Sequence, residues 1–271
     1  MCYKHQISNI VRQLIMVTSI FVICQSISAQ PVETLEIQGE TFSVDHMGNV
    51  FWSHNQTLYK YQTGTGEKYE YTDNSSGSIH SFDVSNPLKI LVYHKAFNLI
   101  VFLDNNLSPI RSAVNLNEMG LNNTGACCIS HSGGFWLLNT TLNQIQHYSS
   151  NLQSTQETPV IKELRDTQDQ TPQLIEKNRQ LYCHLPDCCT LVFDRFGNLV
   201  NRYPLKNVDN IQILNENIYY FYKGTLNRIV GKKGENEKVG LPKKDNYWDD
   251  GKISRKRLYL RKNQTIYFYN R

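Results

Sequence analysis

The sequence predicts an all-β fold: a six-bladed β-propeller that is closed by an N-terminal strand and preceded by a cleaved signal peptide. Three observations favour this fold. An aromatic residue recurs in six β-rich units at intervals of 38 to 46 residues, a Thr-Leu or similar pair follows it in each unit, and the last unit ends one strand short. The recurring aromatic residues are Trp52, Tyr93, Trp136, Tyr182, Tyr220 and Tyr259.

The repeat has the length of a propeller blade. Periods of about 40 to 45 residues with four short strands are typical of blades, whereas helical repeats of similar length would show a 3.6-residue periodicity. Turn-forming residues such as Gly48-Asn49 and Ser132-Gly133 separate the first strand of a unit from the second. Six blades are therefore predicted, and five blades with an irregular end is the alternative count.

The segment Glu33 to Ile37 is the predicted closing strand. The chain ends at Arg271, directly after the third strand of the sixth unit, Thr265 to Asn270, so that the outer position of this blade is unfilled. A strand from the start of the mature chain would fill it and cover an edge that an open ring would expose.

The first 30 residues have the pattern of a secretory signal. Lys4 and Arg12 supply a positive start, Leu14 to Ile23 is mostly apolar and uncharged, and small residues lead to a cleavage point near Ala29. The apolar run is too short for a transmembrane helix, which needs about 20 such residues. We therefore expect residues 1–30 to be a signal peptide.

The mature part, residues 31–271, is then expected to be one propeller located in the periplasm. No second long apolar stretch follows the signal, so no transmembrane segment is expected.

Five cysteines remain after the signal, so at least one is unpaired. Cys183 with either Cys188 or Cys189 is a candidate disulfide in an oxidising compartment. The spacing of the cluster does not match a zinc pattern. Buried free thiols are the alternative for Cys127 and Cys128, and no metal site is assigned.

Charge is distributed unevenly along the mature chain. Residues 31–222 carry 12 basic and 19 acidic side chains, whereas residues 223–271 carry 14 basic and 5 acidic ones. This basic sector is compatible with an acidic partner, an anionic polysaccharide or membrane headgroups. The alternative is solvated lysines on strand edges. No aromatic platform for single-stranded nucleic acid accompanies the charges, so nucleic acid is not an expected partner.

The candidate binding residues lie in the long loop that enters the sixth unit. They are Tyr247, Trp248, Asp249 and Asp250. An exposed Tyr-Trp pair beside two carboxylates is suited to stacking a sugar or anchoring a protein partner. The alternative is that Trp248 packs between two blades.

No local motif for catalysis is present. His-Glu-x-x-His, Gly-x-Ser-x-Gly and phosphate-cradling glycine loops are missing from the sequence. His94 and His184 end two second strands, where a metal or a general base is conceivable, but a surface histidine is the more common case. No catalytic residue and no cofactor is therefore assigned.

The second unit carries a resemblance to a known family. Residues 83–93, DVSNPLKILVY, and residues 97–104, FNLIVFLD, resemble a group of exported propeller proteins from Bacteroidota that includes the plug subunit of the type 9 secretion translocon. The resemblance implies a periplasmic protein that closes the inner mouth of an outer-membrane barrel. Its residues look structural, so it transfers no binding position.

Two functions follow as hypotheses. The first is a non-enzymatic periplasmic interaction module with a protein partner at the outer membrane, in the specific case the type 9 secretion barrel. The alternative is a carbohydrate-active or lactone-hydrolysing propeller enzyme that uses the loop at residues 247–250.

Overall fold

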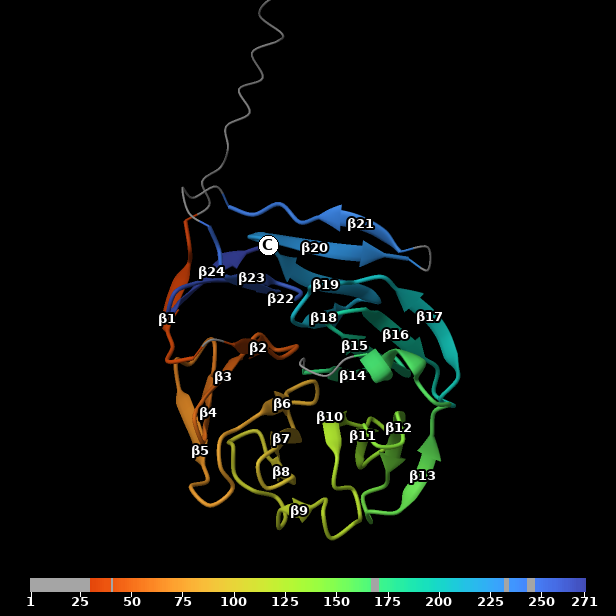
Figure 1. Cartoon of the computed structure of the whole chain (residues 1–271). Helices are drawn as coiled ribbons and strands as arrows, with labels where there is room; N and C mark the ends of the chain where they lie inside the picture. Colours follow the sequence, from red (N-terminus) through yellow and green to blue (C-terminus); the bar gives the residue numbers. More distant parts are fainter. Residues whose placement is uncertain (1–29, 40, 167–170, 232–233, 243–246) are drawn as a thin grey trace, which may run out of the picture. The chain divides into compact units, whose positions relative to one another are not determined.

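The computed structural model describes residues 30–271 except 40, 167–170, 232–233 and 243–246. The predicted signal peptide, apart from Gln30, lies outside these residues. The described chain forms six four-stranded antiparallel sheets that are arranged as blades around a common centre (Figure 1). The all-β, six-bladed propeller is thus confirmed.

The strands of blades 1 to 3 follow each other from the centre outwards. They are β2 (Phe42–Val44), β3 (Val50–His54), β4 (Thr57–Tyr61) and β5 (Lys68–Thr72); β6 (Ser81–Asp83), β7 (Ile90–His94), β8 (Leu99–Leu103) and β9 (Val114–Asn115); and β10 (Thr124–Ile129), β11 (Phe135–Asn139), β12 (Gln144–Tyr148) and β13 (Ser154–Glu157).

Blades 4 to 6 repeat the order, and a short 3₁₀ helix, η1 (Lys162–Asp166), precedes blade 4. The strands are β14 (Gln173–Lys177), β15 (Gln180–Leu185), β16 (Cys189–Phe193) and β17 (Leu199–Tyr203); β18 (Ile211–Leu214), β19 (Asn217–Tyr222), β20 (Thr225–Val230) and β21 (Glu235–Lys238); and β22 (Asp250–Ile253), β23 (Arg257–Lys262), β24 (Thr265–Asn270) and β1 (Glu33–Glu36).

Strand β1 pairs with β24 at the outer edge of blade 6. Leu35 lies opposite Ile266 in an antiparallel register, and the sheet order is β1-β24-β23-β22. The Glu33 carboxylate accepts hydrogen bonds from the Tyr61 hydroxyl of blade 1 and from Arg257 of blade 6, the latter at 3.0 Å. The segment predicted to complete the last blade therefore contacts both ends of the ring.

The recurring aromatic residues all lie on second strands, directly opposite a residue of the innermost strand. Trp52 faces Phe42, for example, and Tyr259 faces Lys252. All six are buried. Burying one large aromatic side chain per blade stabilises the ring substantially, which explains why the repeat is visible in the sequence.

The apolar core lies between neighbouring blades. Clusters of buried side chains join blade 1 to 2, 2 to 3, 3 to 4 and 4 to 5, and a further cluster joins blade 6 to 1. Along the described residues no helix is long and apolar enough to cross a membrane.

Candidate functional site: the central channel

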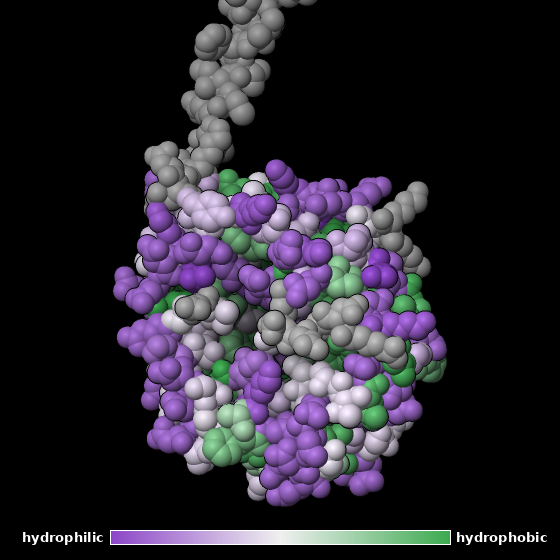
Figure 2. Space-filling model, viewed as in Figure 1, coloured by the Kyte–Doolittle hydropathy of each residue, from purple (hydrophilic) through white to green (hydrophobic). Residues whose placement is uncertain are grey.

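The innermost strands β2, β6, β10, β14, β18 and β22 enclose a cavity of ≈ 440 Å³. Figure 2 shows the surface hollowed near the middle of the ring. Because every blade is traversed in the same order, all innermost strands run in one direction along this channel. One mouth is therefore formed by the residues that enter these strands, and the other by the residues that leave them.

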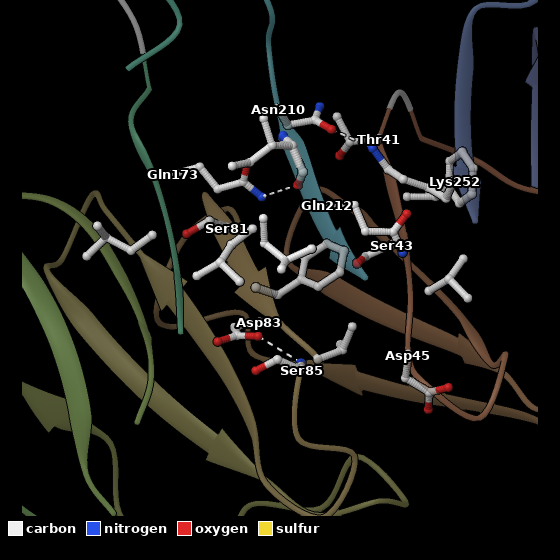
Figure 3. A pocket seen from close by; sticks show the side chains of 18 of the residues that line it. Thr41, Ser43, Asp45, Ser81, Asp83, Ser85, Gln173, Asn210, Gln212 and Lys252 are labelled. Carbon is white, nitrogen blue, oxygen red and sulfur yellow. Dashed lines mark hydrogen bonds between the residues drawn. The ribbon is translucent and has the colours of Figure 1, made fainter. Parts of the chain in front are cut away.

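The two mouths carry different residues. Thr41, His80, Asp209 and Asn210 line the entering end, and Lys252 reaches toward it. Figure 3 shows Thr41, Asn210 and Lys252 on one side of the cavity, with Asp45, Asp83 and Ser85 on the other. The leaving end is thus a separate site with its own charges.

Two glutamines tie the innermost strands of blades 4, 5 and 6 together. Gln173 accepts a hydrogen bond from Ile211 N at 2.8 Å and donates one to Ile211 O at 3.2 Å. Gln212 does the same for Ile253, with distances of 3.0 Å and 2.8 Å. Each amide thereby satisfies the free backbone edge of the next inner strand, as a further strand would.

Two carboxylates serve blade 3 in a similar way. Asp83 accepts a hydrogen bond from Ile129 N at 2.8 Å, and burial raises the pKa of this carboxyl. Glu176 accepts hydrogen bonds from Trp136 Nε1 at 2.6 Å and from His131 N at 3.2 Å. These acids hold neighbouring blades together, so their hydrogen-bonding capacity is largely used inside the protein.

Lys252 is the buried cation of the channel. Its ammonium donates hydrogen bonds to the side chains of Asn210 and Asp250, and it lies 5.9 Å from the centroid of the Phe42 ring. The lysine thereby connects blades 5, 6 and 1 at the entering end.

The structure separates the four predicted binding residues. Tyr247 is 66% exposed, whereas Trp248 is 3% exposed and packs edge-on against Tyr267 and Tyr269 of β24, at ring centroid distances of 5.5 Å and 6.2 Å. The predicted Tyr-Trp stacking platform is therefore not formed as a pair, and Trp248 contributes to the packing of blade 6.

The two carboxylates also diverge. Asp249 is exposed and accepts a hydrogen bond from Asn263 N at 2.6 Å. Asp250 is buried, accepts a hydrogen bond from Gly251 N and contacts Lys252 at 3.4 Å. Only Tyr247 and Asp249 are thus presented together at the surface.

Tyr247 lies over Gly224, in the turn between β19 and β20. A Cβ atom at Gly224 would lie 2.7 Å from the Tyr247 ring, and Gly224 has a φ of 74°. The turn needs glycine for both reasons, which fixes the place of the exposed aromatic side chain.

The two strand-end histidines are buried, so their interpretation as surface residues is wrong. The ring of His184 bonds Thr190 Oγ1 at 2.9 Å and donates to Val208 O at 2.7 Å. Burial lowers the pKa of His184. His94 bonds Gly77 O at 2.9 Å. Both histidines hold loops in place.

The five cysteines among the described residues are all free thiols. Cys183 lies opposite Leu191 and Cys189 opposite Leu185, so no cysteine pairs directly across the strands. Burial raises the pKa of Cys127, Cys128, Cys183 and Cys189. Among the described residues no group of His, Cys, Asp and Glu is arranged to hold a metal ion.

The sequence analysis did not predict the two glutamine clamps, which are the pairs of hydrogen bonds between Gln173 and Ile211 and between Gln212 and Ile253. Gln173 begins β14 (QLIEK) and Gln212 stands between two isoleucines of β18 (IQIL), so a glutamine in the inner strands of two successive blades was the available signal. Their partners lie in the next blade, which only a spatial arrangement reveals.

No protein-family model and no curated protein matches the sequence. Solved structures do match. A streptogramin B lyase structure is 12% identical with a TM-score of 0.57, and the match covers 88% of this chain and 87% of that one.

Two further structures have comparable scores. A chain of a mitotic checkpoint complex is 10% identical with a TM-score of 0.57, over 90% of this chain and 92% of that one. A catalytically inactive virginiamycin B lyase from Staphylococcus aureus with quinupristin is 12% identical with a TM-score of 0.54, over 88% and 87%. At such identities these likenesses establish the propeller fold alone.

Proposed function

We propose that this protein is a non-enzymatic propeller of the periplasm that docks through one face of its ring on a protein partner at the outer membrane. The specific partner we propose is the barrel of the type 9 secretion translocon, whose inner mouth the propeller would close. The resemblance of residues 83–104 motivates this choice.

The use of the polar groups in the channel carries the non-enzymatic part of the proposal. Catalysis needs acids or bases that can exchange protons with a substrate. Here Gln173, Gln212, Asp83 and Glu176 are engaged between blades. Because these side chains are used to join the blades, they support a scaffold that binds partners through its outer faces.

Exposed apolar side chains lie at both ends of the ring, with Met47, Leu88, Ile110 and Phe196 at the end where the innermost strands leave and four others at the end where they begin. These four are Phe97, Leu142, Val160 and Tyr247, each 48% to 66% exposed and each in a connection at the entering end. Aromatic and large apolar residues are enriched at the centres of protein interfaces. Two exposed aromatic residues, Phe97 and Tyr247, lie on the entering face and one, Phe196, lies on the opposite face. We therefore propose that the entering face docks on the partner.

Purification of the tagged full-length protein from its native envelope tests the proposal. The expected result is co-purification of the secretion barrel, and recovery of the propeller alone counts against it. The pair Phe97→Ser and Leu142→Ser should lower the recovery of the barrel. The pair Met47→Ser and Leu88→Ser removes two apolar side chains that are even more exposed, from the opposite face, and should leave recovery unchanged.

A carbohydrate-active or lactone-hydrolysing enzyme is the second candidate. The joint exposure of Tyr247 and Asp249 favours it, since an aromatic ring beside a carboxylate can hold a sugar. If Asp249→Asn and Asp250→Asn leave every detected activity on such substrates unchanged, this loop is not the active site.

A further inference from the structure

The leaving mouth of the channel has a rim of basic side chains. His46 follows β2, Lys177 ends β14 and Arg255 follows β22, and all three line the central cavity. His46 and Arg255 are exposed and Lys177 is half-buried. Three blades thus contribute a basic group to one opening.

His46 and Arg255 belong to a second hollow on the same side. It measures ≈ 450 Å³, lies between blades 6 and 1, and is also lined by Lys256 and Arg257. The two hollows adjoin through these shared residues, which extends the basic rim outward from the channel.

The carboxylates of Asp45 and Asp83 near this mouth already accept hydrogen bonds, mostly from backbone N–H groups. Asp45 accepts hydrogen bonds from Met47 N, Asn49 N and Asn49 Nδ2 at 2.8 to 2.9 Å. Asp83 accepts them from Ser85 N and Ile129 N, both at 2.8 Å. Neither carboxylate forms an ion pair with the rim.

Two of the basic side chains, by contrast, are unengaged, whereas Arg257 is paired with Glu33. Within the described part of the chain, the side chains of Lys177 and Arg255 make no hydrogen bond and no ion pair. Cations that converge on a concave opening with low-dielectric walls attract anions more strongly than the same charges on a flat surface. The rim therefore provides unused binding capacity for a negative group.

The wall behind the rim carries apolar side chains beside polar ones such as Ser43 and Gln212 (Figure 3). Val44, Val84, Ile175 and Ile213 line the cavity inward from the basic residues. An inner strand of about four residues rises about 13 Å. The length fits an extended alkyl chain better than it fits a compact inorganic ion.

We propose that the leaving mouth binds an amphipathic anion, with its carboxylate or phosphate group at Lys177, Arg255 and His46 and its alkyl chain in the channel. The proposal does not depend on the docking partner proposed above, because docking uses the opposite face of the ring.

Calorimetric titration of the mature protein with sodium decanoate tests the site, with 1-decanol and inorganic phosphate as probes of the chain and of the charge alone. We expect decanoate to bind more tightly than either probe. Across shorter carboxylates, affinity should rise about three- to fourfold per added methylene, since each is buried. No binding of decanoate, or phosphate binding as tight as decanoate, would overturn the proposal.

The variant Lys177→Gln, Arg255→Gln removes two cations from the rim. It should weaken decanoate binding about tenfold or more, which corresponds to about 1.4 kcal/mol or more. The matched control Lys95→Gln, Lys206→Gln removes two exposed lysines from the entering face and should bind as the parent does. Equal affinity of the rim variant and the parent would contradict the site.

A second experiment distinguishes a membrane lipid from a free carboxylate as the source of the anion. If the parent protein sediments with phosphatidylglycerol vesicles and the rim variant does not, the anion is a membrane lipid. Decanoate binding without sedimentation would assign it to a free carboxylate. Circular dichroism of both variants checks that the propeller is intact.

Discussion

At the seam between blades 6 and 1, main-chain pairing and large apolar side chains hold the ring, whereas the inner edge of the seam between blades 5 and 6 is held by one glutamine and one lysine. The first seam includes Leu35, Trp52 and Phe268 in one buried cluster. The second has Gln212 on the backbone of Ile253.

The difference follows from how each seam is made. Blades 5 and 6 are consecutive in the chain, so a polar link suffices to set their inner spacing. Blade 6 combines β1 from the start of the chain with three strands from its end, so the closure must offset the entropy lost when the two ends of the chain are brought together. Apolar burial and a paired strand provide that stabilisation.

The largest expected effect comes from removing β1. A chain that starts at Gly39 loses the burial of Leu35 and Ile37, each worth about 1.5 to 3 kcal/mol, and exposes the edge of β24. We expect a loss of about 3 to 6 kcal/mol in the free energy of unfolding, measured by chemical denaturation. A chain that starts at Val32 is the control, and equal stability of the two would contradict the closure.

A smaller effect is expected at the polar seams. Gln212→Leu leaves the N–H and C=O of Ile253 without their partner, at a cost of about 1 to 2 kcal/mol in unfolding free energy. Gln173→Leu should cost a similar amount at Ile211, because the geometry is the same. Gln212→Glu keeps the shape but loses the donor to Ile253 O, so wild-type stability of this variant would refute the two-bond clamp.

The seam between blades 4 and 5 should also be sensitive to pH, since the buried His184 links β15 to Val208. Burial lowers its pKa in the folded state. The unfolded chain therefore binds the proton more readily, and the stabilisation is complete above about pH 6.5 and is lost as the pH falls through the folded pKa.

Denaturation at several pH values measures this dependence. His184→Gln should flatten the slope of unfolding free energy against pH below about 6.5. The exposed His54→Gln serves as control and should keep the parent slope. An unchanged slope in His184→Gln would show that this seam is not the pH-sensitive one.

The smallest effect on stability is expected at Tyr247. Its ring is 66% exposed over Gly224, so Tyr247→Ala should change the unfolding free energy by less than about 0.5 kcal/mol. The same variant should weaken co-purification of the proposed partner. A large loss of stability would instead assign Tyr247 to the packing of blades 5 and 6.

Much of the fold could be predicted because its signals lie within short stretches of the sequence. One aromatic residue and one strand pattern per blade are visible in the sequence, since each blade must bury the same side of its second strand. The loop at residues 247–250 was predicted from the sequence, but its separation into two exposed and two buried residues was not. Trp248 turns inward to Tyr267 and Tyr269, and Asp250 turns to Lys252, for reasons that lie in strands outside the loop.

The sequence by itself determined the six blades and their strand order, because alternation and turn chemistry act over a few residues. Only the tertiary structure decided which polar groups meet. Gln212 and Ile253 lie 41 residues apart in the chain, and Glu33 and Arg257 lie 224 apart. Such contacts, and the collection of Lys177, Arg255 and His46 at one mouth, exist only once the ring has closed and placed the strand ends side by side.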